Sequence, residues 1–393
     1  MRKIVANLLI FGIFLFPVML WLLWLIKPSV KTNILIVDKT ALTKEGLEHR
    51  AFDWVLAHRK YFKPDGSFYS AEKDYIGFFP GENEHFVIKD LHGFSSGQID
   101  SLSNRLDMAY FTDNYGIYKD EWYQTKHRTD YSELLYGGLA KNDVVLMRKM
   151  KEKKKLILAE FNLFATPTPA SVRSEAETLL GLKWSGWTGR YYEQLDTTKN
   201  PDLPKWIIKL YKSQHKNKWS FTNPGIVFVH SSDTIVILEK GTNLTFGVPV
   251  VKSFKYGVEK FDLPKEISYP YWFDITLSSD TANKVISYYE LFPNAKGDSI
   301  LHRYHIPKIF PATFEHINDS PFYYFCGDFS DSPIHNTWVE ITGIQYIKMF
   351  VMNDLDLSDR TPFFWRYYLP MTSKILDDYF KKPLYFKLSG INF

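Results

Sequence analysis

Residues 156–161 have the sequence Leu-Ile-Leu-Ala-Glu-Phe, a short apolar run that follows three lysines. A continuous apolar run of about four to eight residues is typical of a strand buried on both faces of a parallel sheet. Similar runs alternate with helical patterns along the chain, in the order strand 34–37, helix 46–60, strand 85–88, helix 96–105, strand 106–111, helix 132–154, strand 156–161 and helix 170–180. This alternation predicts an α/β fold with a parallel sheet covered on both faces.

The pattern changes in the C-terminal part of the chain. After about residue 240, strand-like pieces dominate and an amphipathic helix follows them; the predicted elements are strands 271–277, 285–291, 322–326 and 346–352 and helix 362–379. We therefore predict a flavodoxin-like three-layer α/β domain over 28–250 and a more β-rich α+β part over 251–393. The second part is either a separate domain or an extension of the same sheet.

The N-terminal region contains an uncharged apolar run. Residues 4–26, IVANLLIFGIFLFPVMLWLLWLI, follow Arg2 and Lys3. As a helix this run spans roughly 34 Å, against ~30 Å of hydrocarbon in a bilayer. It is longer than the core of a cleavable signal, and no Ala-x-Ala site follows it. We therefore predict a transmembrane signal anchor over 1–27, with the body of this single-pass protein extracytoplasmic at the cell membrane. A buried core helix and a cleaved signal are the alternatives.

Composition narrows the possible functions. Hydrophobic residues make up 45% of the chain and charged residues 23%, as in folded globular proteins. The net charge of +4 includes Arg2 and Lys3, so the body is near neutral and lacks the basic footprint of a nucleic-acid binder. The single cysteine, Cys326, excludes an intrachain disulfide and a cysteine-built zinc site.

The sequence contains no motif that fixes a reaction. It lacks G-x-S-x-G, G-x-x-x-x-G-K-[ST] and H-E-x-x-H, and no G-x-G-x-x-G follows the first predicted strand. These absences weigh against the common esterases, nucleotide-binding enzymes and metalloproteases. We expect neither a cofactor nor a metal.

Polar residues follow several of the predicted strands, and in open α/β sheets ligands bind at that edge. The segments expected to gather there are 38–40, 90–92, 112–115, 160–162 and 230–233. Asp113 and Glu160 are the carboxylates at the ends of two adjacent strands, with Asn162 beside them. Such a pair suits general acid/base chemistry or glycoside hydrolysis. In the alternative, Asp113 caps a turn and Glu160 pairs with an arginine.

Two further segments contain candidate ligand-binding residues. The string 184–192 places Trp184, Trp187 and Arg190 close together, as in an aromatic platform with an arginine clamp for a sugar or carboxylate. A buried aromatic corner explains the same string. Asp328, with Asp331, follows a predicted strand and could hold a hydroxyl or a cation, although such pairs more often form turns.

The order of elements from 34 to about 240 resembles the flavodoxin-like sheet of class I glutamine amidotransferase-like domains. That family places a catalytic cysteine on a sharp turn between a strand and a helix, but no cysteine occurs here before Cys326. Amidotransferase activity is therefore not implied. The strings TDNYGIY, LILAEFN, SGWTGRYY and FYYFCGDFSD also look similar to uncharacterised membrane-anchored bacterial envelope proteins, a resemblance that implies no catalytic residue.

Two hypotheses follow for the function. In the first, the protein is a membrane-anchored, non-catalytic module that binds or scaffolds at the cell envelope, with a glycan as its candidate ligand. Trp184, Trp187, Arg190, Asn162 and Asp328 would then contact the ligand. In the second, it is a carboxylate-dependent glycan hydrolase or related enzyme that uses Asp113 and Glu160.

Overall fold

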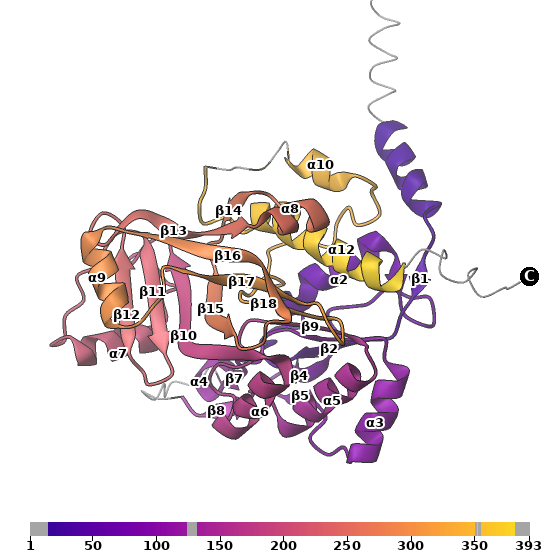
Figure 1. The fold of residues 1–393 in the computed structure, drawn as a ribbon, viewed down its shortest axis with the longest axis horizontal. Helices are drawn as coiled ribbons and strands as arrows, with labels where there is room; N and C mark the ends of the chain where they lie inside the picture. The colour runs from indigo at the N-terminus through magenta and orange to yellow at the C-terminus, as the bar shows by residue number, and fades with distance from the viewer. Residues whose placement is uncertain (1–14, 124–131, 350–351, 353–354, 382–393) are drawn as a thin grey trace, which may run out of the picture.

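The computed structural model describes residues 15–123, 132–349, 352 and 355–381. Within these ranges the protein is a mixed α/β fold built on one large mixed sheet, with a smaller antiparallel sheet beside it (Figure 1). The large sheet has ten strands, in the spatial order β14 (Glu266–Ser268), β13 (Leu244–Ser253), β16 (Asn283–Pro293), β17 (Ile309–His316), β18 (Phe322–Phe325), β9 (Leu156–Glu160), β6 (Met108–Phe111), β2 (Ile34–Asp38), β4 (Ile76–Pro80) and β5 (Phe86–Lys89).

The centre of this sheet is parallel. Strands β4, β2, β6, β9 and β18 run in the same direction, and antiparallel strands flank them on both sides. Every residue of β6 and β9 is buried, as expected for strands covered on both faces. The apolar run at 156–161 therefore forms the strand on which the sheet is centred.

Helices cover both faces of the large sheet (Figure 1). On one face lie α2 (Leu47–Arg59), α8 (Lys255–Phe261) and the C-terminal α12 (Leu369–Phe380), and on the other lie α3 (Ser96–Arg105), α5 (Lys141–Glu152) and α6 (Ala170–Leu180). Further helices are α4 (Lys119–Trp122), α7 (Lys205–Gln214), α9 (Ala295–Arg303), α10 (Ile344–Met349), α11 (Thr361–Phe363) and the π-helical turn Phe364–Tyr368 before α12.

The smaller sheet is antiparallel and has the order β12 (Ile235–Glu239), β11 (Gly225–His230), β10 (Leu182–Tyr192) and β15 (Trp272–Ser278). The β10 strand contains the string 184–192, which the sequence pattern did not identify as a strand. Its pairing with β15 shifts register between Trp184 and Thr188, where Gly186 has φ 93°. Two short pairs complete the fold, β1 (Val30–Lys31) with β3 (Tyr61–Phe62), and β7 (Ile117–Tyr118) with β8 (Leu134–Tyr136).

Several predicted elements differ from the structure. The predicted helix 132–154 is wrong in its first half, where β8 precedes α5. Gly137 and Gly138 separate them with φ 147° and 75°, values that a continuing helix cannot accommodate. The predicted strand 346–352 is wrong over its described residues, which belong mainly to the helix α10. Residue 250, near which the domain boundary is predicted, lies in β13, a strand of the large sheet. Of the two alternatives for residues 251–393, a separate domain or an extension of the same sheet, neither is decided by this position.

The predicted membrane anchor requires a correction. Residues 15–25 form a helix, and residues 4–14 of the expected anchor lie outside the described residues. Across the described part of the chain, no helix has the length and apolar character needed to cross a bilayer. The predictions of a transmembrane helix, a membrane partner and an extracytoplasmic, single-pass location are therefore wrong.

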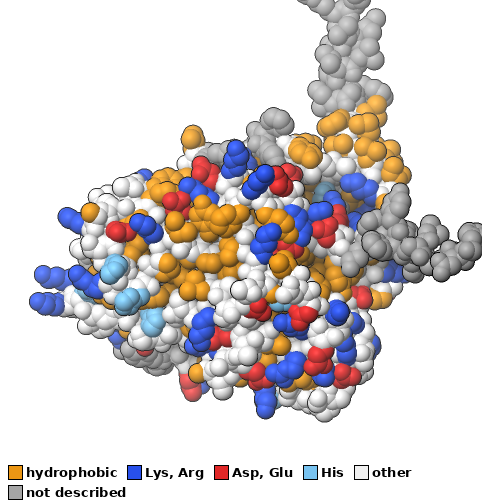
Figure 2. Space-filling model, viewed as in Figure 1, with side chains coloured by type: hydrophobic (Ala, Val, Ile, Leu, Met, Phe, Trp, Pro, Cys, Tyr) orange, Lys and Arg blue, Asp and Glu red, His pale blue; other side chains and the backbone are white. Residues whose placement is uncertain are grey.

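The helix over residues 15–25 contacts the body of the protein through its C-terminal half. Trp24 is buried and its indole N–H donates to the carbonyl of His58 at 3.0 Å. The Trp21 indole donates to the Glu340 carboxylate at 2.9 Å. The outer face of the helix exposes apolar side chains, which appear at the upper right of Figure 2 and include Leu15, Phe16, Val18, Met19, Leu22 and Leu23.

A buried ion pair fixes α5 against the end of β2. The ammonium group of Lys39 lies 2.5 Å from the Asp143 carboxylate and donates to the carbonyl of Gly138 at 2.8 Å. The Asp143 carboxylate also accepts a hydrogen bond from the backbone N–H of Ala140, the N-cap residue of α5. This contact joins the first strand of the parallel sheet to the helix that precedes β9.

We expect Lys39→Met to lower the free energy of unfolding by about 3–5 kcal/mol, because it leaves the Asp143 carboxylate buried without its cation. Lys149→Met is the matched control, since Lys149 is on the same helix but pairs with Glu152 near the surface. Its effect should stay within about 1 kcal/mol. Urea denaturation of the three proteins measures both changes, and equal losses would contradict the assignment.

Candidate functional site

The carboxyl ends of the parallel strands bring together polar residues from distant parts of the chain. The backbone carbonyl of Asp113, after β6, accepts from the N–H of Lys39, after β2, at 3.1 Å. The amide of Asn162, after β9, donates to the Asp113 carboxylate at 3.1 Å. Asp328 follows β18; burial raises the pKa of its carboxyl group well above the usual value, and the negative charges of Asp331 and Asp113 raise it further. Three of the predicted ligand or catalytic residues, Asp113, Asn162 and Asp328, therefore lie at one edge of the sheet.

Asp113 is buried at this edge. Its Oδ1 accepts from the backbone N–H of Tyr115 at 2.7 Å as well as from Asn162, so the carboxylate also stabilises a local turn. Burial raises the pKa of Asp113 to about 7; the hydrogen bond from Tyr115 lowers it, and the negative charge of Asp38 raises it. A carboxyl group with this pKa can exchange a proton near neutral pH.

Glu160 lies deeper, with 1% of its surface exposed. Its two oxygens accept from the hydroxyls of Tyr110 and Ser330 and from the backbone N–H groups of Phe329 and Ser330. Burial raises the pKa of Glu160 to about 7, although these four donors act in the opposite direction. The carboxylate therefore connects β9 to the segment after β18, and no arginine pairs with it among the described residues.

A buried histidine lies between two carboxylates next to the site. His49 Nδ1 is 2.6 Å from Asp38 Oδ2, while Nε2 is 3.0 Å from the carbonyl of Ala71 and 3.9 Å from Asp53 Oδ2. Burial lowers the pKa of His49, but the hydrogen bond to Asp38 and its charge outweigh this effect and raise the pKa above its usual value. Because both ring nitrogens face acceptors, the imidazolium form satisfies the site best.

A pocket of about 380 Å³ lies at the C-terminal end of β10 in the smaller sheet, next to the loop that precedes β15 and to Ser358 and Arg360. The guanidinium carbons of Arg360 and Arg190 lie 3.7 Å and 5.1 Å from the ring centre of Tyr271. The Tyr271 hydroxyl donates to Asp331 at 2.7 Å, and Arg360 pairs with the same carboxylate at 3.2 Å. The lining residues are Arg190, Tyr191, Tyr192, Glu193, Gln194, Lys199, Asn200, Asp202, Pro270, Tyr271, Ser358 and Arg360.

The predicted aromatic platform of Trp184, Trp187 and Arg190 is divided in the structure. Trp184 and Trp187 are buried in the core, 6% exposed each, and the Trp184 indole donates to the Trp187 carbonyl at 3.0 Å. Neither lines the pocket that contains Arg190. Arg190 instead contacts the rings of Tyr192 and Trp272, at 4.7 Å and 5.5 Å, in addition to Tyr271.

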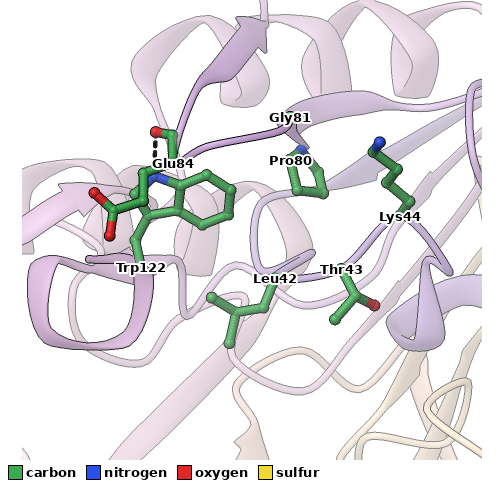
Figure 3. Close-up of a pocket in the computed structure, with 7 residues that line it drawn as sticks. All are labelled: Leu42, Thr43, Lys44, Pro80, Gly81, Glu84 and Trp122. Atoms are coloured by element: carbon green, nitrogen blue, oxygen red, sulfur yellow. Dashed lines mark hydrogen bonds between the residues drawn. The ribbon is translucent and has the colours of Figure 1, made fainter. Parts of the chain in front are cut away.

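A second pocket, of about 370 Å³, lies beyond the ends of β2 and β4 (Figure 3). Leu42, Thr43 and Lys44 come from the loop after β2, and Pro80 and Gly81 from the end of β4. The indole N–H of Trp122 donates to the backbone oxygen of Glu84, which closes one side of this pocket.

Sequence reasoning missed Tyr271 and Arg360, which complete the Arg190 pocket. Tyr271 was predicted only as the start of a strand, and Arg360 stood in no motif. Arg190, Tyr271 and Arg360 come from segments that are far apart in the sequence. Nothing in a single sequence indicates that such residues will be in contact, because only the folded chain brings them together. The segment 230–233 forms the hairpin between β11 and β12, as the spacing of the two apolar runs around it predicts, and it belongs to the smaller sheet.

No group of three or more His, Cys, Asp or Glu side chains within the described ranges is arranged to hold a metal ion. Cys326 is fully buried after β18, and burial raises the pKa of its thiol well above the usual value. The polar groups of the site are therefore carboxylates, guanidinium groups, amides and phenols.

Comparison with known proteins gives a broad fold likeness only. No family model matches the sequence, and no curated protein matches it. A glutamine amidotransferase from Thermotoga maritima aligns with 91% of this chain and all of its own, at 10% identity and a TM-score of 0.36. ThuA-like proteins from Bacteroides uniformis and Parabacteroides merdae align with 77% and 76% of this chain and 84% and 79% of theirs, at 8% and 10% identity and TM-scores of 0.34 and 0.33.

These matches contain a glutamine amidotransferase, which agrees with part of the resemblance drawn from the sequence. At such identities and TM-scores they carry no argument about activity or ligand.

Asp53 allows a test of the electrostatics beneath the site. Its buried oxygens have no hydrogen-bond partner among the described residues, and burial raises its pKa to about 7, with His49 lowering it and Asp74 raising it. Because the pKa is higher in the folded state than in the unfolded chain, the folded state binds the extra proton, and stability falls as pH rises through about 7.

We expect the stability of Asp53→Asn, which imitates the protonated form, to rise relative to the wild type by roughly 1–3 kcal/mol between pH 5 and pH 8. Asp298→Asn in α9, where the carboxylate is exposed, is the control and should show no such pH dependence. Denaturant unfolding at the two pH values makes the comparison. A stability difference between Asp53→Asn and the wild type that is the same at pH 5 and pH 8 would refute the expectation.

Proposed function

We propose that this protein is a non-catalytic α/β module that binds a glycan in the pocket containing Arg190, Tyr271 and Arg360. The observation that carries the proposal is the placement of two guanidinium groups over one tyrosine ring in a pocket of about 380 Å³. Small-molecule sites combine aromatic surface with a few fixed polar groups that orient the ligand.

The lining of the pocket supports a polyhydroxylated ligand. Tyrosine rings offer flat apolar surfaces, while hydroxyl, amide and carboxylate groups both donate and accept hydrogen bonds. The polar lining groups other than the arginines belong to Tyr191, Tyr192, Glu193, Gln194, Lys199, Asn200, Asp202 and Ser358. A sugar presents the matching combination of ring faces and hydroxyls.

The strand order of the large sheet supports a more specific fold than mixed α/β. We infer that the parallel part of the large sheet is flavodoxin-like, because its strands follow the order β4-β2-β6-β9-β18, in which the second strand along the chain stands outside the first. The chain between β9 and β18 adds the smaller sheet and the antiparallel strands. Ligands of open α/β sheets bind outside the carboxyl ends of the strands. Asp331, which follows β18, contacts Tyr271 and Arg360 of the pocket and so connects the pocket to this edge.

The carboxylates favour binding over catalysis. Neither Asp113 nor Glu160 lines the pocket, and four donors occupy the oxygens of Glu160. A residue in that state cannot also attack a sugar or activate a water without losing these contacts.

An oligosaccharide panel tests the proposal, with calorimetry on any sugar that binds. Tyr271→Leu should weaken binding by roughly 10-fold or more, because it removes the aromatic face of the pocket. Tyr346→Leu, which changes an exposed tyrosine of α10 outside the pocket, should leave the affinity unchanged. Circular dichroism confirms that both variants are folded. Equal affinity of the two variants, or no binding by the wild type, would contradict the proposal.

The alternative is a carboxylate-dependent glycan hydrolase that uses Asp113 and Glu160. Burial raises the pKa of each group to about 7, the range in which a carboxyl group can act as a general acid at neutral pH. Any oligosaccharide that binds is incubated with the wild type, Asp113→Asn and Glu160→Gln, and reducing ends are measured. Turnover by the wild type that both substitutions abolish, with binding retained, would favour the enzyme.

A further inference from the structure

The three cationic side chains that line the proposed glycan pocket differ in whether a carboxylate lies within ion-pair distance. Arg360 pairs with Asp331 and donates to its backbone carbonyl at 2.6 Å, and Lys199 lies 3.6 Å from Asp196. Arg190 has no carboxylate within ion-pair distance in the part of the chain that the structure describes. Its Nε is buried and lacks a hydrogen-bond partner there. Arg190 is therefore the lining cation that lacks a carboxylate partner, and its Nε donor is unpartnered among the described residues.

A second unpartnered group stands on the same face of the smaller sheet. Tyr192 is 3% exposed, and its hydroxyl has no hydrogen-bond partner among the described residues. Burial raises the pKa of Tyr192 to about 12, with Arg190 lowering it, so the hydroxyl keeps its proton. Arg190 and Tyr192 are two residues apart on β10, so both side chains lie on one side of the strand. Two donors thus face the same pocket.

The position of Arg190 is fixed before any ligand arrives. β10 is an inner strand, and Arg190 pairs with Val227 on one side and Trp272 on the other. The rings of Tyr192, Tyr271 and Trp272 hold the guanidinium through cation–π contacts. A planar guanidinium held in this way can present its N–H fork to a carboxylate without a large loss of side-chain entropy.

The charges around Arg190 limit the anion it can accept. Glu193 and Asp202 also line the pocket and oppose a strongly charged ligand. A planar carboxylate carries one negative charge and matches the guanidinium fork in a bidentate arrangement. A buried polar group without a partner is costly, so the empty donors favour a ligand that fills them.

We propose that the bound glycan is acidic, and that a uronate carboxylate is received by the guanidinium of Arg190 and the hydroxyl of Tyr192. This inference rests on the proposed glycan-binding function. The sugar ring then lies against Tyr271, and Arg360, already neutralised by Asp331, supports the aromatic surface. Arg190 thereby sets the preference for acidic over neutral sugars.

Calorimetry with three matched trisaccharides tests the proposal: one with a terminal glucuronate, one with glucose in its place and one with glucose 6-sulfate. The wild type should bind the glucuronate form about 10-fold or more tightly than the glucose form, as a charge-assisted hydrogen bond implies. Arg190→Gln should remove this difference and keep the weaker affinity. Arg190→Lys should retain part of it, because it keeps the charge but not the fork.

Two further variants protect the test against misfolding. Tyr192→Phe removes only the hydroxyl group and should reduce the preference for the glucuronate form. This variant tests the proposal even if Arg190→Gln does not fold. Arg173→Gln is the matched control, since Arg173 stacks on Trp184 at 4.8 Å outside the pocket, and it should keep the full preference.

The outcomes separate this inference from the proposed function. Equal binding of the acidic and neutral sugars, or a preference that survives both Arg190→Gln and Tyr192→Phe, overturns the inference and leaves glycan binding in place. Tighter binding of the sulfate overturns the carboxylate assignment. No binding of any of the three, together with no binding in the oligosaccharide panel, overturns both proposals.

Discussion

The parallel pairing of β9 with β18 is the contact on which the rest of the fold depends. It joins the N-terminal parallel strands to a strand that arrives only after the smaller sheet and the antiparallel strands have been completed. Glu160 strengthens this junction, because its carboxylate accepts from the backbone of Phe329 and Ser330 just beyond β18. A buried carboxylate with all of its donors in place rigidifies the segment that follows, and that segment carries Asp328 and Asp331.

This junction explains how the site is assembled. Asp331 orients both Tyr271 and Arg360, so the carboxyl end of β18 determines where the pocket wall lies. The opposite wall comes from β10, whose central place in the smaller sheet fixes Arg190 and Tyr192. The pocket therefore combines the end of β10 with two residues, Tyr271 and Arg360, that the segment after β18 orients. Its unpaired donors are found on the more rigid wall.

The sequence predicted those elements whose local pattern decides their structure. The strands at 34–37, 106–111 and 156–161 were found because strands buried on both faces need uninterrupted apolar runs. β10 was missed because glycines and a register shift interrupt its alternation of side chains. The edge residues Asp113, Asn162 and Asp328 could be predicted from strand ends, whereas Tyr271 and Arg360 could not, because tertiary contacts alone bring them to Arg190. The predicted location was wrong because it was inferred from the hydropathy of the N-terminal run alone. Hydropathy does not show which part of an apolar run packs against the rest of the protein.

The long insertion between β9 and β18 has a consequence for how the chain acquires its structure. While a ribosome is still producing residues 161–321, β9 has its β6 neighbour but lacks its partner on the other side. A fold that closes through such sequence-distant pairing has high contact order and folds slowly. During that interval β9 is an apolar, open-edged strand, a template for pairing with other chains. The open edge of β9 is therefore covered only when the last parallel strand, β18, has been made.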